Sequence, residues 1–482
     1  MADRMSRRQV VGLGAAIAGA AVAAPVLANT AFAGTQDAAP AAGPAAAPAA
    51  AGAGHTVVPS DLPWPEAQTI LAAIKQPEFP DVNFDVTAYG AKGDNKTDNT
   101  AAFAAAITAA NAAKGGHVIV PSGTYVTGAV YLKSNVDFHL NAGATLKFSG
   151  DASKFPTVLT RYEGIECMNR SPMIYAYNES NIALTGSGTL DASATSSWNK
   201  GSDRAYLESL ISKGTTDPHK RVVPGSGHNM RSTFVEPYAC DTVLISGVTL
   251  KNSMFWQLHP TLCTNVTVDG VTTDASTAHN NTDGCDPESC DHIVIRNCTL
   301  GAHDDNIAIK SGRDAHGRRV NVPTQNLVVY NCLMNGNWGA ITCGSEITGG
   351  VKNVYAYKCD VVGATKFALY VKSNTKRGGG AQNINLDSFV GAPTRSFAYV
   401  TMTYNSQTGN TPPMFGPLNI TNCGTTKTPL VFNVAGLSND HVKGLTVTNC
   451  AFNGVKTTTN TIKNTDNVVF TNVTINGKKV TK

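Results

Sequence analysis

A short phrase of alternating apolar and polar residues recurs along most of the chain. Nine copies read IALTG, VLISG, VTVDG, IVIRN, LVVYN, VYAYK, LNITN, LTVTN and VVFTN, and they start at Ile182, Val243, Val266, Ile293, Leu327, Val354, Leu418, Leu445 and Val468. Such alternation predicts a β-strand. The closing residue is usually Gly or Asn, which tolerate a left-handed backbone, so each copy predicts a strand followed by a tight turn.

The spacing of these copies predicts a solenoid. In the central and C-terminal parts, consecutive copies lie about 23, 27 or 34 residues apart, which suits one coil of a parallel β-helix. One coil cannot bury its inner face alone, so stacked coils share a continuous core. An antiparallel sandwich or propeller would need hairpin turns such as Asn-Gly between neighbouring strands, and single Asn or Gly residues stand there instead. We therefore expect an all-β fold, a single-stranded parallel β-helix.

The N-terminal part of the chain departs from the repeat. The stretch from Asp98 to Ala113 predicts a short helix with Asp98 or Asn99 as its N-cap, and we expect this helix to cap the solenoid. Residues 34–55 are rich in Ala, Pro and Gly and predict a linker. The β-helix domain is accordingly expected over residues 56–482.

Residues 1–33 have the pattern of an export signal. Arg7 and Arg8 precede an apolar, Ala-rich run, and Ala31-Phe32-Ala33 is an A-x-A-like cleavage site. Paired arginines at this place indicate a twin-arginine signal peptide, so we expect a periplasmic or secreted protein that has no membrane contact once the signal is removed. A membrane-spanning anchor is the alternative, but the run is short and contains Gly and Pro.

Composition narrows the classes of function. With 42% hydrophobic and 15% charged residues, the 482-residue chain is expected to be globular rather than disordered. A formal net charge of +4 gives no sign of a nucleic-acid partner. The eleven cysteines show no zinc spacing, so we expect no structural zinc. Cys285 and Cys290 form a candidate disulfide. Five cysteines share one position of the repeat, which indicates core packing; they are Cys298, Cys332, Cys359, Cys423 and Cys450.

Two adjacent aspartates, Asp304 and Asp305, precede an apolar strand in the stretch HDDNIAIK, residues 303–310. Asp283 lies 21 residues before Asp304, close to one coil, and coils stack about 4.8 Å apart, so we expect the three carboxylates in one patch. Their repulsion raises the pKa of at least one. A protonated acid beside ionised partners is what hydrolysis of a glycosidic bond requires. The chain must bend before the strand for both neighbours to reach solvent.

Two other interpretations of these acids stay open. Asp304 can cap a turn while the remaining carboxylates are solvated surface charges. An oxygen-rich cluster of this kind can also bind Ca²⁺.

The same residues resemble a known family. NTDG at residues 281–284 and HDDNIAIKSG at residues 303–312 are similar to the signature of glycoside hydrolase family 28, the polygalacturonases and related pectin hydrolases. FDVTAYGAKGDNKTDNTAAFAAAI, residues 84–107, resembles the N-terminal cap segment of that family. The stretches NSMFWQLHP, CGSEITGGVKNV and KSNTKRGGG resemble its bacterial, often exo-acting members. The resemblance extends from about Phe84 to Lys482.

The resemblance implies a right-handed parallel β-helix and metal-independent, cofactor-free hydrolysis of α-glycosidic bonds in pectin with inversion. By the same resemblance, Asp304 is the general acid, and Asp283 and Asp305 activate the attacking water. Inverting enzymes usually keep acid and base roughly 6.5–9.5 Å apart, and we expect that spacing here. The implied partner is a pectic polysaccharide or oligogalacturonide, bound by a monomer.

Two positions depart from the family pattern. Trp338 in Asn337-Trp338-Gly339 stands where the family commonly has His, and Tyr370 in Tyr370-Val371-Lys372 stands where it usually has Arg. Trp338 cannot exchange a proton, but it can stack on a sugar ring or pack on the solenoid wall. Lys372 is retained as a point charge for the carboxylate of a substrate, whereas Tyr370 removes the bidentate fork. Lys376 or Arg377 can take over that role. Lys372, Trp338 and Tyr370 are therefore the candidate substrate-binding residues.

Two long insertions without the repeat bear on the mode of action. Residues 193–234 and 313–323 are rich in Gly, Arg, His and Lys, and loops of this length often shape a binding groove. If they close one end, the enzyme works from chain ends, so we expect an exo-acting polygalacturonase. Three alternatives remain: a hydrolase of rhamnogalacturonan or another decorated pectin, a Ca²⁺-dependent lyase-like enzyme, and a non-catalytic glycan-binding solenoid.

Overall fold

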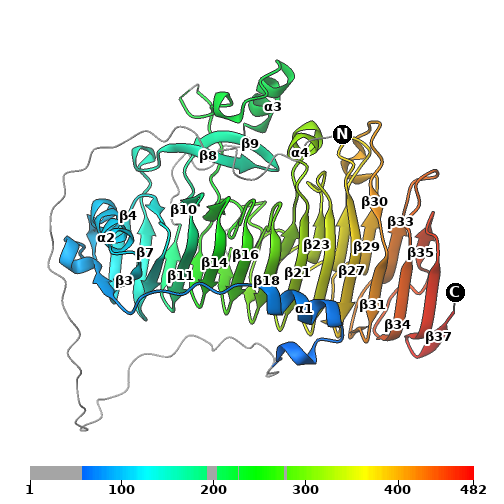
Figure 1. Ribbon diagram of the computed structural model, residues 1–482. Helices are drawn as coiled ribbons and strands as arrows, with labels where there is room; N and C mark the ends of the chain where they lie inside the picture. The colour runs from blue at the N-terminus through cyan, green and yellow to red at the C-terminus, as the bar shows by residue number, and fades with distance from the viewer. Residues whose placement is uncertain (1–56, 193–202, 226, 276–278, 482) are drawn as a thin grey trace, which may run out of the picture. The chain divides into compact units, whose positions relative to one another are not determined.

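The computed structural model describes residues 57–192, 203–225, 227–275 and 279–481, and these fold as the predicted right-handed parallel β-helix (Figure 1). In this described part of the chain, the coils contribute strands to three long faces, which we call sheets 1, 2 and 3. Within these three sheets, neighbouring strands pair in parallel, apart from the antiparallel β36–β37 pair at the C-terminal end. The expectation of an all-β solenoid is confirmed.

The strands have the following bounds. Sheet 1 contains β1 (Asn83–Asp85), β3 (Gly116–Val120), β6 (Val136–Leu140), β11 (Ser180–Gly186), β14 (Asp241–Ser246), β16 (Thr264–Asp269), β18 (Asp291–Arg296), β21 (Thr324–Tyr330), β24 (Val351–Tyr357), β27 (Gly380–Asp387), β30 (Met414–Phe415), β31 (Leu418–Thr421), β32 (Gly424–Thr425), β34 (Leu445–Phe452), β36 (Val468–Ile475) and β37 (Lys478–Val480). Sheet 2 contains β2 (Asp94–Asp98), β4 (Gly123–Thr127), β7 (Ala144–Phe148), β12 (Thr189–Asp191), β15 (Thr249–Lys251), β17 (Thr272–Asp274), β19 (Thr299–Leu300), β22 (Leu333–Met334), β25 (Asp360–Val361) and β28 (Val390–Gly391).

Sheet 3 has two sections that isolated bridges connect. The first contains β5 (Val130–Tyr131), β10 (Ile174–Tyr177) and β13 (Val235–Tyr238), and the second contains β20 (Ile307–Ile309), β23 (Gly339–Gly344), β26 (Phe367–Lys372), β29 (Ser396–Thr401), β33 (Leu430–Ala435) and β35 (Thr461–Lys463). Between them, Val235 pairs with Leu258, Leu258 with Cys285, and Cys285 with Ile307. Sheet 3 is therefore continuous along the stack.

The turn predicted at the end of each phrase is present in all nine copies. The closing residues all have φ between +46° and +106°; they are Gly186, Gly247, Gly270, Asn297, Asn331, Lys358, Asn422, Asn449 and Asn472. Left-handed backbone costs Gly little and Asn less than most residues, which explains the recurrent Gly or Asn. β27 is a further copy of the same unit, in which Ser388 takes the left-handed position.

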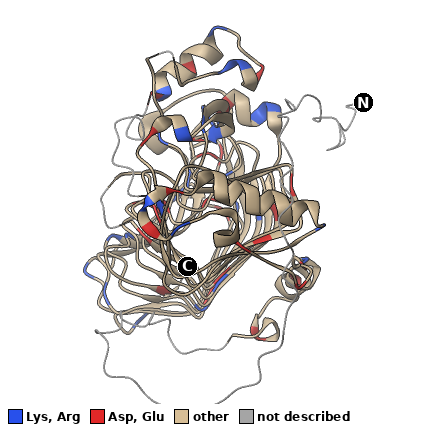
Figure 2. Ribbon diagram, turned by 90° about the vertical axis from the view of Figure 1, so that its left-hand side faces the viewer, with Lys and Arg blue, Asp and Glu red and all other residues tan. Residues whose placement is uncertain are grey.

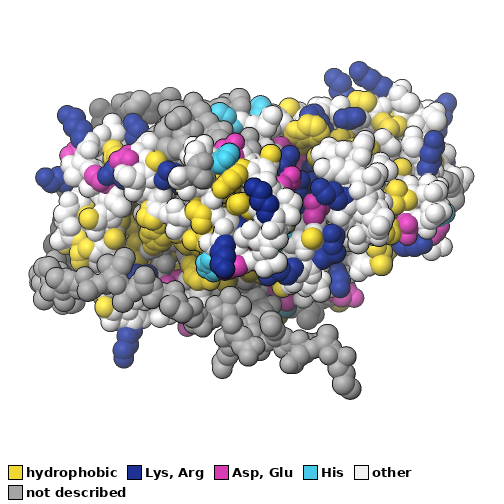
Figure 3. All heavy atoms as spheres, turned by 90° about the horizontal axis from the view of Figure 1, so that it is seen from above, with side chains coloured by type: hydrophobic (Ala, Val, Ile, Leu, Met, Phe, Trp, Pro, Cys, Tyr) yellow, Lys and Arg dark blue, Asp and Glu magenta, His cyan; other side chains and the backbone are white. Residues whose placement is uncertain are grey.

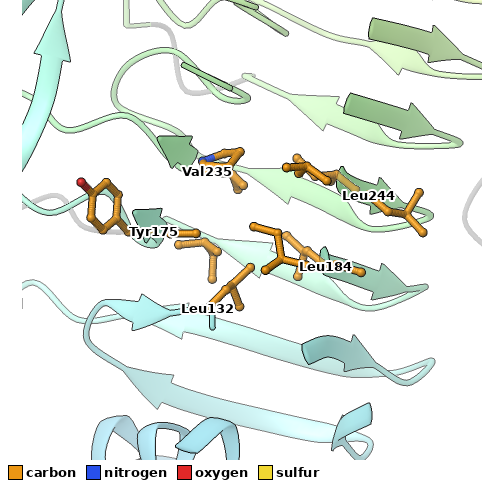
Figure 4. Close-up of a pocket in the computed structure, with 12 residues that line it drawn as sticks. Leu132, Tyr175, Leu184, Val235 and Leu244 are labelled. Carbon is orange, nitrogen blue, oxygen red and sulfur yellow. The ribbon is translucent and has the colours of Figure 1, made fainter. Parts of the chain in front are cut away.

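The interior of the β-helix is apolar. Leu132, Leu184 and Val235 come from neighbouring coils and point inward, whereas Tyr175 and Leu244 point away from the interior (Figure 4). Inward residues of all three sheets belong to one continuous hydrophobic core. Burial of this surface drives the stacking of coils, since each buried aliphatic side chain contributes about 1.5–3 kcal/mol.

The cysteines belong to this core. All eleven are buried and free, and the five at the shared repeat position pack inside, as expected. The candidate disulfide between Cys285 and Cys290 is wrong, because both thiols are free.

Helices cover the end and one side of the stack. α2 (Thr100–Ala112) is the predicted capping helix, and it covers the first coil (Figure 2). Asn99 is its N-cap residue, while the carboxylate of Asp98 accepts the N–H of Thr100 at 3.1 Å. α1 (Pro65–Ala73), which the repeat did not predict, packs its apolar face on β18 and β21 of sheet 1. Short 3₁₀ turns lie at Pro59–Asp61, Val86–Tyr89, Ala152–Lys154, Pro218–Lys220 and Tyr404–Ser406.

Two excursions leave the coils above sheet 3. The antiparallel hairpin of β8 (Thr157–Tyr162) and β9 (Ile165–Arg170) lies there with α3 (Arg204–Ser212) of the first long insertion, and α4 (Asp314–Val320) forms most of the second (Figure 1). The export signal over residues 1–33 and the linker over residues 34–55 fall outside the described residues, as do residues 193–202 of the first insertion. Among the residues that the structure describes, no helix combines the length and hydropathy needed to cross a bilayer.

Candidate active site

Sheet 3 brings the three aspartates together. Cys285 pairs with Ile307 on the next coil, a step of 22 residues, so Asp283 lies beside Asp305 and Asp304 stands one residue to the side. One carboxylate oxygen of each aspartate lies within 4.8 Å of the others. The structure therefore places the three in one patch. It does not show the expected wider gap between acid and base, because this approach is shorter than the roughly 6.5–9.5 Å of inverting enzymes.

Asp304 is the most exposed member of the cluster. The chain bends at His303 and Asp304 before β20 begins, as the strand parity required. The carboxylate of Asp304 accepts the backbone N–H groups of Asn281 at 3.2 Å and Asp305 at 3.0 Å. Asp304 is half-buried, whereas Asp283 and Asp305 are only 2% and 1% exposed. Asp304 is thus the best placed of the three to reach a glycosidic oxygen.

Asp305 is held on both oxygens. Oδ2 accepts a hydrogen bond from Nζ of Lys372 at 2.8 Å, and Oδ1 accepts the backbone N–H of Gly339 at 2.7 Å. Both partners come from the next coils of sheet 3, so the β-helix register itself places them. A buried ion pair with an additional hydrogen bond fixes the orientation of this carboxylate.

Asp283 lies deeper and has a different partner. Its Oδ2 is 3.7 Å from Nζ of Lys310, while Oδ1 has no hydrogen-bond partner among the described protein groups. Lys310 also donates to Gly344 O at 3.0 Å and to Glu346 Oε2 at 3.3 Å. The fourth neighbour of Lys310 is Asp286, a fully buried carboxyl at 3.8 Å. Oδ1 of Asp283 is itself buried, and the neighbouring carboxyl of Asp286 interacts with Asp283.

Burial and mutual repulsion of the carboxylates favour a proton on one member of the cluster. Burial raises the pKa of Asp304, and the charge of Asp305 raises it further. Burial also raises the pKa of Asp283, to which the charge of Asp304 adds. Lys310 and Lys372 act in the opposite direction on both groups. A proton on Asp304 removes one cause of the raised pKa of Asp283, so an acid beside an ionised base is the favourable division of charge.

These residues fit a metal ion poorly. Ca²⁺ takes six to eight oxygen ligands, and here only three carboxylates converge among the described residues. Two ammonium groups, Lys372 at 2.8 Å from Asp305 and Lys310 at 3.7 Å from Asp283, already occupy the positions next to them. The donor set therefore suits a hydrolase with paired carboxylates better than a calcium-dependent lyase.

The two positions that depart from the family pattern lie on the coils after the acids. Trp338 is half-buried, and its backbone N–H donates a hydrogen bond to the backbone carbonyl of Asp304 at 3.1 Å. The ring of Trp338 lies under Nζ of Lys366, 3.3 Å from its centroid. Tyr370 is buried and stacks on Tyr399, with ring centroids 5.4 Å apart, so its ring packs within sheet 3.

The basic residues suggested as replacements for the missing Arg have other partners. Arg377 is buried and pairs with Glu346 at 3.3 Å. Nζ of Lys376 lies 3.5 Å from Asp314 in α4. Lys372, the retained cation, is 6% exposed and is bound to Asp305. Both suggested replacements therefore already have a carboxylate partner, and only Lys376 is exposed.

Sheet 3 is covered on the N-terminal side of the acids. Trp256 precedes Asp283 by one coil in the same column and is 2% exposed. Phe255 stacks on Trp256 at 5.0 Å and on Tyr162 of the β8–β9 hairpin at 4.8 Å. These rings belong to a separate apolar cluster with Leu207 of α3 and residues of the hairpin. The hairpin and insertion therefore cover the sheet directly before the acids.

Buried ion pairs attach the β8–β9 hairpin to sheet 3. Arg161 of β8 donates to Glu288 at 2.9 Å, and neither side chain is exposed. Glu288 also lies 2.9 Å from Nε2 of His259, and Nδ1 of that ring is 3.5 Å from Glu236. The two glutamates raise the pKa of His259 to about 9, against the opposing effect of burial. A cationic His259 between two carboxylates makes the closed end a fixed part of the fold.

Sequence reasoning missed several residues of the site. It gave no role to Lys310, although this side chain contacts three buried carboxylates. A usable signal was present, because Lys310 shares its strand parity with Asp304 and follows the inward Ile309 directly, so its side chain points to the groove. Arg161 and Trp256 gave no such signal, because their partners lie on separate loops.

A parallel β-helix with clustered aspartates on one sheet, closed at one end, is an arrangement that suits a carboxylate-dependent glycoside hydrolase. The sequence profile of the family described as "Glycosyl hydrolases family 28" matches residues 111–411. This match covers more than half of the chain, and the chain therefore belongs to glycosyl hydrolases family 28.

Solved structures agree with this assignment. A hyperthermoactive exopolygalacturonase from Thermotoga maritima is 34% identical, with a TM-score of 0.80, and the match covers 86% of this chain and 96% of that one. A family 28 exopolygalacturonase from Yersinia enterocolitica has a TM-score of 0.68 over 84% of this chain and 76% of that one, and at 22% identity it supports the fold alone.

Curated relatives are more distant. A probable polygalacturonase of Vitis vinifera is 27% identical over 67% of this chain, and an exo-poly-alpha-D-galacturonosidase of Dickeya chrysanthemi is 28% identical over 62%. The chain spans 63% and 53% of the lengths of these two relatives.

Proposed function

We propose that this protein hydrolyses α-glycosidic bonds of galacturonate-containing pectin from the chain end. The observation that carries the proposal is the cluster of Asp283, Asp304 and Asp305 on sheet 3, with one oxygen of each within 4.8 Å of the others, in a chain of family 28. The relatives named as a probable polygalacturonase, an exo-poly-alpha-D-galacturonosidase and an exopolygalacturonase support the substrate class.

Asp304 is the proposed general acid. It is half-buried, its pKa is raised by burial and by Asp305, and its two hydrogen bonds come from backbone N–H groups that leave it free to donate a proton. Asp283 and Asp305 are the proposed base pair. Lys372 orients Asp305, and the Asp283 carboxylate beside it accepts a proton from the attacking water.

Exo action follows from the closed end of the groove. A polymer that meets Trp256, the β8–β9 hairpin and the Arg161–Glu288 pair cannot continue past the acids without opening a buried ion pair. Only a chain end then fits beside Asp283. Sugars of the remaining polymer extend over the later coils, where Trp338 and Tyr370 lie.

The first experiment compares wild type with Asp304→Asn on unbranched polygalacturonate and, separately, on rhamnogalacturonan. Reducing ends and ultraviolet absorbance are followed. We expect saturated monogalacturonate from the unbranched polymer, and a loss of turnover on the order of 10²–10⁴ in Asp304→Asn, which keeps the shape of the side chain. Asp360→Asn on sheet 2 is the matched control, since it removes one carboxylate away from the groove.

Each other result points to a named alternative. Cleavage confined to rhamnogalacturonan would identify that polymer, rather than polygalacturonate, as the substrate. An unsaturated, ultraviolet-absorbing product would indicate a lyase. Binding without turnover on either polymer would favour a glycan-binding solenoid. An Asp304→Asn variant that keeps more than a tenth of wild-type turnover would remove Asp304 as the acid.

We also propose that residues 1–33 direct twin-arginine export and that residues 34–55 are a linker. The support is the Arg7-Arg8 pair before an Ala-rich run and the A-x-A-like site at residues 31–33. Mass spectrometry of protein from the producing cells tests the cleavage after Ala33. An uncleaved N-terminus on the exported protein would contradict it. A monomer is expected, and sedimentation measures it.

A further inference from the structure

One edge of sheet 3 carries a column of polar, charged and aromatic side chains, one from each successive coil. Backbone hydrogen bonds define it: Trp338 N–H donates to Asp304 O at 3.1 Å, Lys366 N–H to Trp338 O at 2.7 Å, and Arg395 N–H to Lys366 O at 3.1 Å. The sheet register agrees, because Phe367 pairs with Ser396 next to this column. We call Asp304, Trp338, Lys366 and Arg395 the edge column.

The two cations of the edge column form no close ion pair with any carboxylate in the part of the chain that the structure describes. Among the described residues, no carboxylate oxygen lies within 4.0 Å of Lys366 or Arg395, although most groove cations form such pairs. Lys366 is half-buried and Arg395 is exposed. They stand on adjacent coils about 4.8 Å apart, so each charge raises the free energy of the other. An anion bound between them relieves that repulsion.

Aromatic rings hold both cations in place without using their hydrogen-bond donors. Nζ of Lys366 lies 3.3 Å from the centroid of the Trp338 ring. The guanidinium of Arg395 lies over Phe367 at 5.9 Å and over Tyr399 at 5.8 Å. A cation above a ring is attracted by its face while its N–H groups stay available. The space-filling view of this side of the molecule shows Lys and Arg side chains beside hydrophobic ones (Figure 3).

The electrostatics connect the edge column to the acids. Burial lowers the pKa of Lys366, while the charges of Asp304 and Asp305 raise it and that of Arg395 lowers it. The acids repel an anionic substrate at the point where it must approach Asp304. Lys366, two coils further along, and Arg395, three coils along, offset this repulsion where the remaining sugars of the polymer lie.

We infer that Lys366 and Arg395 bind the carboxylates of uronic-acid units on the C-terminal side of Asp304, and so select acidic over esterified glycans. This inference rests on the proposed function. In this chain Tyr370 has replaced a planar cation, Lys372 is bound to Asp305, and Lys376 and Arg377 pair elsewhere. Arg395 brings back a bidentate fork from a different coil.

The test uses Lys366→Gln, Arg395→Gln and the double variant, with Lys352→Gln as control. Lys352 is exposed on β24 of sheet 1, so its change removes one positive charge from another face. Binding is measured by calorimetry in the Asp304→Asn background, which separates it from turnover. The probes are an oligogalacturonide in its free-acid form and the same oligomer fully methyl-esterified. Thermal unfolding checks that each variant is folded.

We expect each single variant to weaken binding of the free acid on the order of tenfold, the loss of about one charge-assisted hydrogen bond, and to leave the ester within about twofold. The salt dependence of free-acid binding should also decrease. Lys366→Arg should restore most of the affinity, which a merely structural role of Lys366 would not predict.

Two results would overturn the inference. The first is an equal loss for acid and ester, which would assign the residues to packing, and the second is unchanged binding of the free acid in the double variant. Failure of the proposed function has a different signature. If wild type hydrolyses no galacturonan but the variants still lose affinity for the free acid alone, the edge column is a uronate site and the proposed hydrolysis is wrong.

Discussion

Replacing Lys372 by Met tests whether the acid cluster is stabilised by its lysines. Nζ of Lys372 lies 2.8 Å from Asp305, and the two side chains are 7% and 1% exposed. Met keeps much of the volume and removes the charge, so Asp305 is left as a buried carboxylate with one backbone N–H from Gly339. Removing one partner of such a pair typically costs about 3–5 kcal/mol. We expect the free energy of unfolding to fall by about that amount at pH 7.

The pH dependence of the stability difference tests whether the lost stability comes from the charge of Lys372. The pKa of Lys372 is raised well above 10.5, because the charge of Asp305 outweighs the opposing effect of burial. The stability from this pair is therefore complete at pH 7 and is lost as pH rises, so the difference between wild type and Lys372→Met should shrink above about pH 11. Urea unfolding followed by tryptophan fluorescence measures this at both pH values. Lys352→Met, an exposed change on sheet 1, should stay within about 0.5 kcal/mol of wild type.

A loss below about 1 kcal/mol at pH 7, or a difference that is the same at both pH values, would refute this reasoning. It would mean that the ion pair with Lys372 contributes little to holding the Asp305 carboxylate in place. Asp305 would then be an unsuitable partner for Asp283 in activating water.

Two further predictions concern the reaction. The pKa of Asp304 is raised above 3.8 by burial and by Asp305, so the protonated acid persists to higher pH, and kcat should fall as pH rises through a value above 3.8; a decline complete below it would contradict the assignment. The anomer released first, observed by proton NMR, should be β if hydrolysis inverts. An α product would show retention, which the short carboxylate separation would then explain, and would make Asp283 the nucleophile.

Much of the fold was predictable because one physical rule repeats. Each copy of the phrase requires an inward apolar face and a residue that accepts a left-handed turn, and all nine copies met both conditions. β27 was missed because Ser388 is an unusual residue at that turn. α1 was missed because its contacts are with β18 and β21, which lie far along the chain and which no local pattern shows.

The candidate site was predictable in content and less so in geometry. Parity placed Asp305 inward and Asp304 outward, and the structure agrees. The spacing of 21 residues suggested that Asp283 and Asp304 are neighbours, whereas the coil step of 22 puts Asp283 beside Asp305. The partners of Lys376 and Arg377 could not be predicted, because Asp314 and Glu346 approach them from other coils.

The edge column has a consequence for how this groove can change over time. Each of its side chains comes from a different coil, and main-chain hydrogen bonds rather than side chains hold the coils in register. An exchange at residue 366 or 395 therefore alters the charge offered to one unit of a polymer and leaves the backbone positions of Asp304 and Trp338 unchanged. Substrate preference can therefore change by substitutions on single coils, while the three aspartates keep their positions.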